Sequence, residues 1–165
     1  MDIGTGAGFP GVPLKIAFPH LQACLLDSLK KRVNFLEETF DLLKLEDITA
    51  IHGRAEEFAK NKSYREQYDL CVSRAVSNLA TLSEYCLPYV KVGGHFISYK
   101  SGTVKEELQQ AEKAVKILGG KIQDVVYFNL PDSEIQRSLV VIEKIKTTPG
   151  RYPRKAGTPL KEPLA

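Results

Sequence analysis

The sequence lacks the features that would place this 165-residue chain in a membrane or outside the cell. No apolar run approaches the roughly 20 residues that a spanning helix needs, and no basic flank with an apolar stretch and a cleavage site opens the chain. The three cysteines include no C-x-x-C pair, and Cys24 and Cys71 lie inside apolar runs. We therefore expect buried thiols, no metal site and a cytoplasmic location.

Long polar tracts are also absent, which excludes a mainly disordered chain. With 43% hydrophobic and 26% charged residues, the composition is that of a single globular domain. The net charge of +3 is uneven, because residues 144–165 carry +5 and residues 1–143 carry −2. Lys and Arg gain affinity for polyanions by releasing counterions, so this basic end points to nucleic acid, although a solvated terminus has the same composition.

Apolar β-rich runs alternate with amphipathic helical patterns along most of the chain. Such alternation is typical of a mostly parallel sheet covered by helices. Strands are expected at 21–27, 48–52, 68–73 and 94–100, and helices at 29–43, 55–60, 78–87 and 104–118. Ser28 is the expected N-cap of the first of these helices.

Near the C-terminus this rhythm changes. The β-rich runs 121–129 and 138–146 are separated by eight residues, too few for a crossover helix, so an antiparallel pair is predicted. Prolines and glycines after residue 146 predict an extended segment without a core of its own. We therefore divide the chain into a domain at 1–146 and a basic, extended tail at 147–165.

The glycine-rich opening allows two nucleotide-binding interpretations. Asp2-x-Gly4-x-Gly6-x-Gly8 fits the loop of S-adenosylmethionine (SAM) methyltransferases, whereas Gly6-x-Gly8-x-x-Gly11 fits the dinucleotide fingerprint. The first register places Gly4 directly after the strand, which favours a Rossmann-like SAM-dependent methyltransferase fold. Asp2 also supplies a carboxylate that a cationic amino-acid ligand could use. A nicotinamide-dependent oxidoreductase remains the alternative.

Two acidic positions downstream fit the same cofactor. Asp27 ends the next strand, where a carboxylate can accept hydrogen bonds from both ribose hydroxyls, although it could instead cap the following helix. Ala55 and Glu56 open a short helix after the third strand, where an amide and a carboxylate can meet an adenine edge. A surface acid in the first turn of a helix is the plainer interpretation of Glu56.

Six segments of the chain resemble one known family, the bacterial small-subunit ribosomal RNA guanine-N7 methyltransferases, RsmG, also called glucose-inhibited division protein B. The matching segments, in order, are 2–16, 26–32, 53–57, 73–75, 99–102 and 151–159. Among them, the extension Phe9-Pro10-Gly11 and the basic run that begins Arg151-Tyr152 are particular to this family.

This resemblance implies SAM-dependent methylation of guanine N7 in 16S ribosomal RNA, with the RNA or the small ribosomal subunit as partner and a monomeric enzyme. Together with the loop motif, it implies cofactor contacts at Gly4, Gly6, Phe9, Asp27, Ala55, Glu56 and Arg74. Lys100 and Arg137 correspond to positions that handle the guanine, and the tail cations Arg151, Arg154 and Lys155 are expected to hold phosphates.

The chemistry of this reaction agrees with what the sequence lacks. Guanine N7 has a free lone pair, so no proton must leave before attack and no general base is required. The three histidines, His20, His52 and His95, form no constellation with an acid or a nucleophile.

The N-terminus of this sequence departs from the family pattern. Family members carry a helical segment before the loop and begin the first strand several residues earlier. We therefore expect a truncated first strand and a fragment of a longer enzyme. A SAM- or RNA-binding fragment without catalysis is a further alternative.

Overall fold

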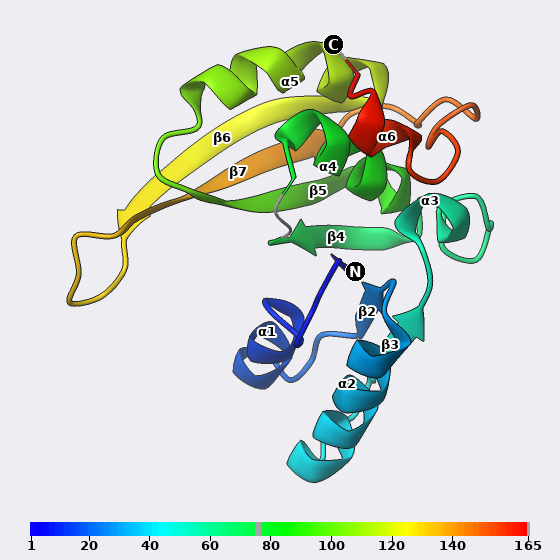
Figure 1. Cartoon of the computed structure of the whole chain (residues 1–165), viewed down its shortest axis with the longest axis vertical. Helices are drawn as coiled ribbons and strands as arrows, with labels where there is room; N and C mark the ends of the chain where they lie inside the picture. Colours follow the sequence, from blue (N-terminus) through cyan, green and yellow to red (C-terminus); the bar gives the residue numbers. More distant parts are fainter. Residues whose placement is uncertain (75–76, 165) are drawn as a thin grey trace.

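The computed structural model, which describes residues 1–74 and 77–164, is built around one seven-stranded sheet (Figure 1). Its strands are Asp2–Ile3 (β1), Ala23–Asp27 (β2), Ile48–His52 (β3), Tyr68–Ser73 (β4), Val90–Ser101 (β5), Gly120–Asn129 (β6) and Gln136–Lys144 (β7). They are ordered β3-β2-β1-β4-β5-β7-β6. The first five are parallel, whereas β7 runs antiparallel to both β5 and β6. The predicted α/β class and its antiparallel C-terminal pair are confirmed.

Helices cover both faces of the sheet. They are Gly11–Ala17 (α1), Lys30–Leu43 (α2), Ala55–Phe58 (α3), Leu79–Cys86 (α4), Lys105–Ile117 (α5) and Thr158–Lys161 (α6), with a 3-10 turn at Leu87–Tyr89. Successive strand residues face opposite sides, so Leu25 packs with α1 and α2 whereas Leu26 joins the larger core on the other face. No helix in the described part of the chain is long and apolar enough to span a bilayer.

The central strand β1 contains only two residues, as the sequence predicts. Asp2 pairs with Leu25 of β2 and with Val72 of β4, so this short strand still joins the two halves of the sheet. The Met1 ammonium donates to the Leu70 carbonyl at 2.9 Å and extends the contact with β4.

The start of α2 differs from the sequence prediction. Ser28 is not the N-cap of α2. The helix begins at Lys30, so Leu29 occupies the N-cap position, and no side chain caps the helix. Instead, the Leu29 amide donates to Asp27 Oδ1 at 3.0 Å, since a carboxylate two residues upstream can reach it.

Cys24 and Cys71 are buried free thiols, as expected. Ala75, the end of one matching segment, lies outside the described residues.

The C-terminal segment is less extended than predicted, because α6 interrupts it and its residues pack on the domain. Tyr152 is 7% exposed and belongs to the main core. Figure 1 shows α6 lying against α4, and the two helices are in contact although they are far apart in the sequence.

Candidate functional site

The glycine loop joins β1 to α1 at the carboxyl end of the central strand. Gly4 and Gly6 have φ angles of 68° and 63°, a left-handed conformation that strains any other residue. The Gly4 amide donates to the Leu26 carbonyl at 2.9 Å and fastens the loop to β2. A Cβ at Gly6 would meet no atom within 4 Å, so this backbone borders open space rather than packed protein.

Asp2 braces the loop from the inside. Its Oδ2 accepts hydrogen bonds from the Thr5 hydroxyl at 2.7 Å and from the Gly11 amide at 2.9 Å. The residue is 2% exposed, and burial raises the pKa of its carboxyl. Asp2 does not line the cleft on the outer side of the loop. The expected contact with a cationic ligand is therefore replaced by hydrogen bonds that hold the loop.

A cleft of about 450 Å³, the glycine-loop cleft, lies on the outer side of the loop, at the carboxyl ends of β1, β2 and β4. All seven residues that the sequence analysis predicts as cofactor contacts line it: Gly4, Gly6, Phe9, Asp27, Ala55, Glu56 and Arg74. Ligands bind at this edge in open α/β sheets because the loops after the strands diverge there.

Asp27 occupies the centre of a hydrogen-bond network at the floor of the glycine-loop cleft. Its Oδ2 accepts from the Gly6 amide at 2.9 Å, and the Arg32 guanidinium lies 3.2 Å from the same oxygen. Asp27 is 2% exposed, whereas the Arg32 side chain is 47% exposed. Asp27 therefore accepts from the residue just before α2 and also lines the cleft.

Glu56 and Tyr85 form the wall of the glycine-loop cleft that α3 and α4 supply. Glu56 is 5% exposed, and its Oε1 accepts the Gly157 amide at 2.8 Å. Burial, with a contribution from the charges of Glu56 and Glu84, raises the pKa of Tyr85 to about 12. The Tyr85 hydroxyl therefore stays protonated and can donate to a ligand.

Phe9 and Arg74 form the boundary between the glycine-loop cleft and a larger cavity. The Arg74 guanidinium carbon lies 5.2 Å from the centroid of the Phe9 ring, a cation–π contact. Both residues line both hollows. A ligand in one hollow therefore shares a wall with a ligand in the other.

The larger hollow, of about 1170 Å³, contains both residues that the resemblance assigns to the guanine, and we call it the Lys100 cavity. Lys100 Nζ donates to the Ser77 carbonyl at 2.7 Å and to Glu107 Oε1 at 2.6 Å. The same Glu107 oxygen accepts the Leu79 amide at 2.6 Å. One carboxylate thus joins β5, the start of α4 and α5 beside this cavity.

Arg137 reaches the Lys100 cavity from β7. It lies opposite Ser101 in the antiparallel register, one residue from the pairing of Lys100 with Ser138. Its guanidinium is half-buried and donates to the Gln136 carbonyl at 3.0 Å. The structure therefore brings both predicted guanine residues together in one cavity, although 37 positions separate them.

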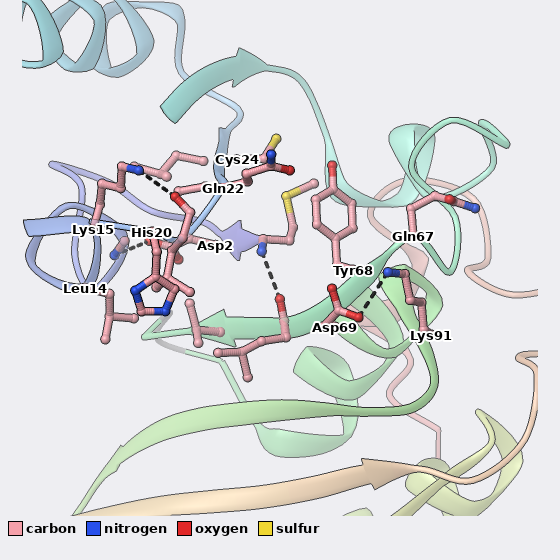
Figure 2. A pocket seen from close by; sticks show the side chains of 17 residues that line it. Asp2, Leu14, Lys15, His20, Gln22, Cys24, Gln67, Tyr68, Asp69 and Lys91 are labelled. Atoms are coloured by element: carbon pink, nitrogen blue, oxygen red, sulfur yellow. Dashed lines mark hydrogen bonds and ion pairs between the residues drawn. The ribbon is translucent and has the colours of Figure 1, made fainter. Parts of the chain in front are cut away.

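Figure 2 shows a third cavity, at the amino ends of the strands. There Lys15 Nζ donates to the carbonyls of Pro19 and Leu21, and Lys91 pairs with Asp69 at 3.0 Å. This hollow contains none of the seven predicted cofactor contacts and neither of the two predicted guanine residues. Within the described residues, no three His, Cys, Asp or Glu side chains gather as a possible metal site.

The fold and the loop define a class of protein, the SAM-dependent methyltransferases with a Rossmann-like sheet. A crystal structure of the SAM-dependent methyltransferase SibL in its apo form superposes with a TM-score of 0.64 at 16% identity, over 88% of this chain and 50% of that one.

Sequence comparison is more specific. Residues 1–140 match the family model of GidB, the rRNA small subunit methyltransferase G, and the chain belongs to this family. Two relatives with that name, from Lachnoclostridium phytofermentans and Clostridium novyi, are 57% and 56% identical to it over 164 residues. Each alignment covers 99% of this chain and 68% of the relative.

Sequence reasoning did not identify three residues that line the two hollows, namely Arg32, Tyr85 and Glu107. Arg32 lies five residues after Asp27, in the first turn of α2, and its guanidinium donates to Asp27 Oδ2 at 3.2 Å. Tyr85 and Glu107 had no comparable local signal, because packing between elements distant in sequence brings them to the site.

Proposed function

We propose that this chain binds SAM in the glycine-loop cleft and methylates N7 of a guanine in 16S rRNA that enters the Lys100 cavity. Bound SAM would supply the methyl group as an electrophilic sulfonium. The observation that carries the proposal is the shared wall of Phe9 and Arg74, since methyl transfer needs donor and acceptor sites that adjoin.

The residues of the glycine-loop cleft fit SAM in their chemistry. The open space at Gly6 lets a ligand approach the backbone closely. Asp27 can accept from the ribose hydroxyls, and Glu56 can accept from the exocyclic amine of adenine. Tyr85 adds a hydroxyl donor on the same side as Glu56.

Lys100 is suited to hold the guanine edge. An ammonium has three N–H donors, and Ser77 and Glu107 take two of them, so one remains for guanine O6. The Glu107 carboxylate also offsets the charge of Lys100, which reduces its repulsion of the cationic methylated purine. Because N7 needs no deprotonation, orientation by these residues supplies the catalysis, with roughly 7–11 kcal/mol available from it.

Residues 1–146 form the methyltransferase domain and residues 147–165 its basic tail, and the protein acts as a monomer in the cytoplasm, where small ribosomal subunits are made. Membership in the methyltransferase family does not favour a nicotinamide-dependent oxidoreductase.

Calorimetry with SAM, S-adenosylhomocysteine and NAD, followed by transfer of labelled methyl groups to 16S rRNA and to small subunits, tests the proposal. We expect binding of the first two ligands and label in 7-methylguanine. Binding of NAD alone would overturn the proposal, and SAM binding without transfer to either substrate would leave only a binding module.

A further inference from the structure

The C-terminal tail, residues 147–164, is tied to the body beside the glycine-loop cleft. Arg65 donates to the carbonyl of Thr148 at 2.7 Å and to that of Tyr152 at 2.9 Å. The Thr81 hydroxyl of α4 donates to the Pro159 carbonyl at 2.9 Å. These contacts join the tail to α4 and to the loop after α3.

Arg154 makes the strongest of the tail contacts. Its Nη2 and Nε donate to Glu84 Oε2 at 2.7 and 3.1 Å, and its amide donates to Oε1 at 2.8 Å. Glu84 is fully buried, one residue before Tyr85 of the cleft wall. A buried carboxylate needs such a partner, because an unpaired charge away from water is costly. Arg154, whose side chain is 24% exposed, is therefore paired with a buried carboxylate, whereas the sequence analysis expected it to hold an RNA phosphate.

Gly157 connects the tail directly to the cleft. Its amide donates to Glu56 Oε1 at 2.8 Å, across 101 positions of sequence. Gly157 has φ of 85°, and a Cβ there would meet no atom within 4 Å. Glycine is therefore favoured at this position because the turn needs a positive φ, and not because a larger side chain would clash. That turn directs the Gly157 amide toward Glu56. Within the described residues, Glu56 Oε2 has no recorded hydrogen bond and remains for a ligand.

We propose that the tail positions the cofactor: the Gly157 amide fixes the Glu56 carboxylate so that its second oxygen selects an adenine, and the Arg154–Glu84 pair holds the tail in place. This inference rests on the proposed function. Gly157 and Arg154 are positioning residues, since neither lines the cleft. The role of the tail is then cofactor recognition, with RNA contact limited to its exposed cations.

Gly157→Val and Gly157→Asn in the full chain test the turn. Valine strongly disfavours positive φ, whereas asparagine tolerates it and keeps the amide in place. We expect about tenfold weaker S-adenosylhomocysteine binding by calorimetry for the valine variant, and near-native binding for the asparagine variant. Arg154→Met should resemble the valine variant, whereas Lys161→Met, which removes an exposed charge from the same tail, should leave the affinity unchanged.

A second ligand separates positioning from general loss of structure. S-inosylhomocysteine lacks the exocyclic amine, so the native chain should prefer S-adenosylhomocysteine, and Gly157→Val should reduce that preference several-fold while thermal melting confirms a folded protein. An unchanged preference in Gly157→Val and Arg154→Met would overturn the inference, as would equal losses in the valine and asparagine variants. Failure of the native chain to bind S-adenosylhomocysteine would instead contradict the proposed function.

Discussion

The guanidinium of Arg74 lies over the ring of Phe9, with 5.2 Å between the guanidinium carbon and the ring centroid, and the pair separates the two hollows of the site. Phe9 is 46% exposed, so both faces of the pair remain accessible to ligands. A ligand in either hollow therefore meets the same pair of side chains. Each ligand that orders this pair prepares a wall of the neighbouring site.

Replacing Phe9 by Leu should therefore weaken both ligands. A cation–π contact contributes about 0.5–2 kcal/mol, so we expect SAM affinity to fall roughly two- to thirtyfold and KM for RNA to rise. Phe35→Leu is a matched control, because Phe35 is a similarly exposed phenylalanine of α2 that lines neither hollow. An effect of Phe9→Leu on only one ligand would contradict the shared wall.

Asp27→Asn should reduce SAM affinity without unfolding the protein. Asparagine retains one acceptor oxygen, which can accept from the Gly6 amide, but loses the charge and an acceptor for the ribose. The loss is about 1–3 kcal/mol, or roughly 5- to 150-fold in affinity by calorimetry. Asp69→Asn serves as the control, since the Asp69 side chain is 89% exposed at the opposite edge of the sheet. Equal affinities for the native and Asp27→Asn chains would remove Asp27 from the binding site.

Lys100→Ala should lower the rate of methyl transfer about tenfold or more when SAM and RNA are both saturating, because a donor to the guanine edge acts on orientation. Glu107→Gln should have a smaller effect in the same direction, and the double variant should lose less than the two effects combined. The dependence of RNA affinity on salt should hardly change in Lys100→Ala. A change in that dependence alone would mean that Lys100 holds a phosphate instead.

Replacing Arg137 should have the opposite effect to replacing Lys100 if Arg137 holds the RNA backbone. Arg137→Ala should weaken RNA binding, and the slope of log affinity against log salt should flatten by about 0.7–0.9. Titration at several salt concentrations measures this slope directly. A lowered saturated rate with an unchanged slope would assign Arg137 to the base.

Asp2 should make the protein less stable as the pH rises through the mildly acidic range. Burial raises the pKa of this carboxyl above 3.8, so the folded chain binds more protons than the unfolded chain between 3.8 and the raised pKa. This contribution to stability is present at low pH and is lost across that window. Unfolding free energies of the native chain and of Asp2→Asn, compared from pH 3 to 7, should converge at the acidic end.

The pKa of the Asp69 carboxyl is shifted in the opposite direction to that of Asp2. Its hydrogen bond from Lys91 lowers the pKa of this carboxyl, so its small contribution is lost as the pH falls. If Asp2→Asn left the pH dependence of stability unchanged, the Asp2 carboxyl would titrate normally in the folded protein.

Local pattern in the sequence was sufficient for most of the fold and for much of the candidate site. Apolar β-rich runs and helical spacings predicted most of the strands and helices, and eight residues between two β-rich runs predicted their antiparallel pairing. The glycine loop and Asp27 were recognisable because each depends on neighbours within a few residues or on one βαβ unit. The resemblance then identified Lys100 and Arg137 without showing how they meet.

Tertiary structure decided which partners these residues have. Asp2 faces the loop and not the ligand side, Arg154 pairs with Glu84 across 70 positions, and Gly157 holds Glu56 across 101. Nothing in the local sequence distinguishes a tail arginine that binds RNA from one that pairs with a buried acid. That choice follows from chain topology, since only the packed fold brings distant charges within hydrogen-bond distance and removes them from water.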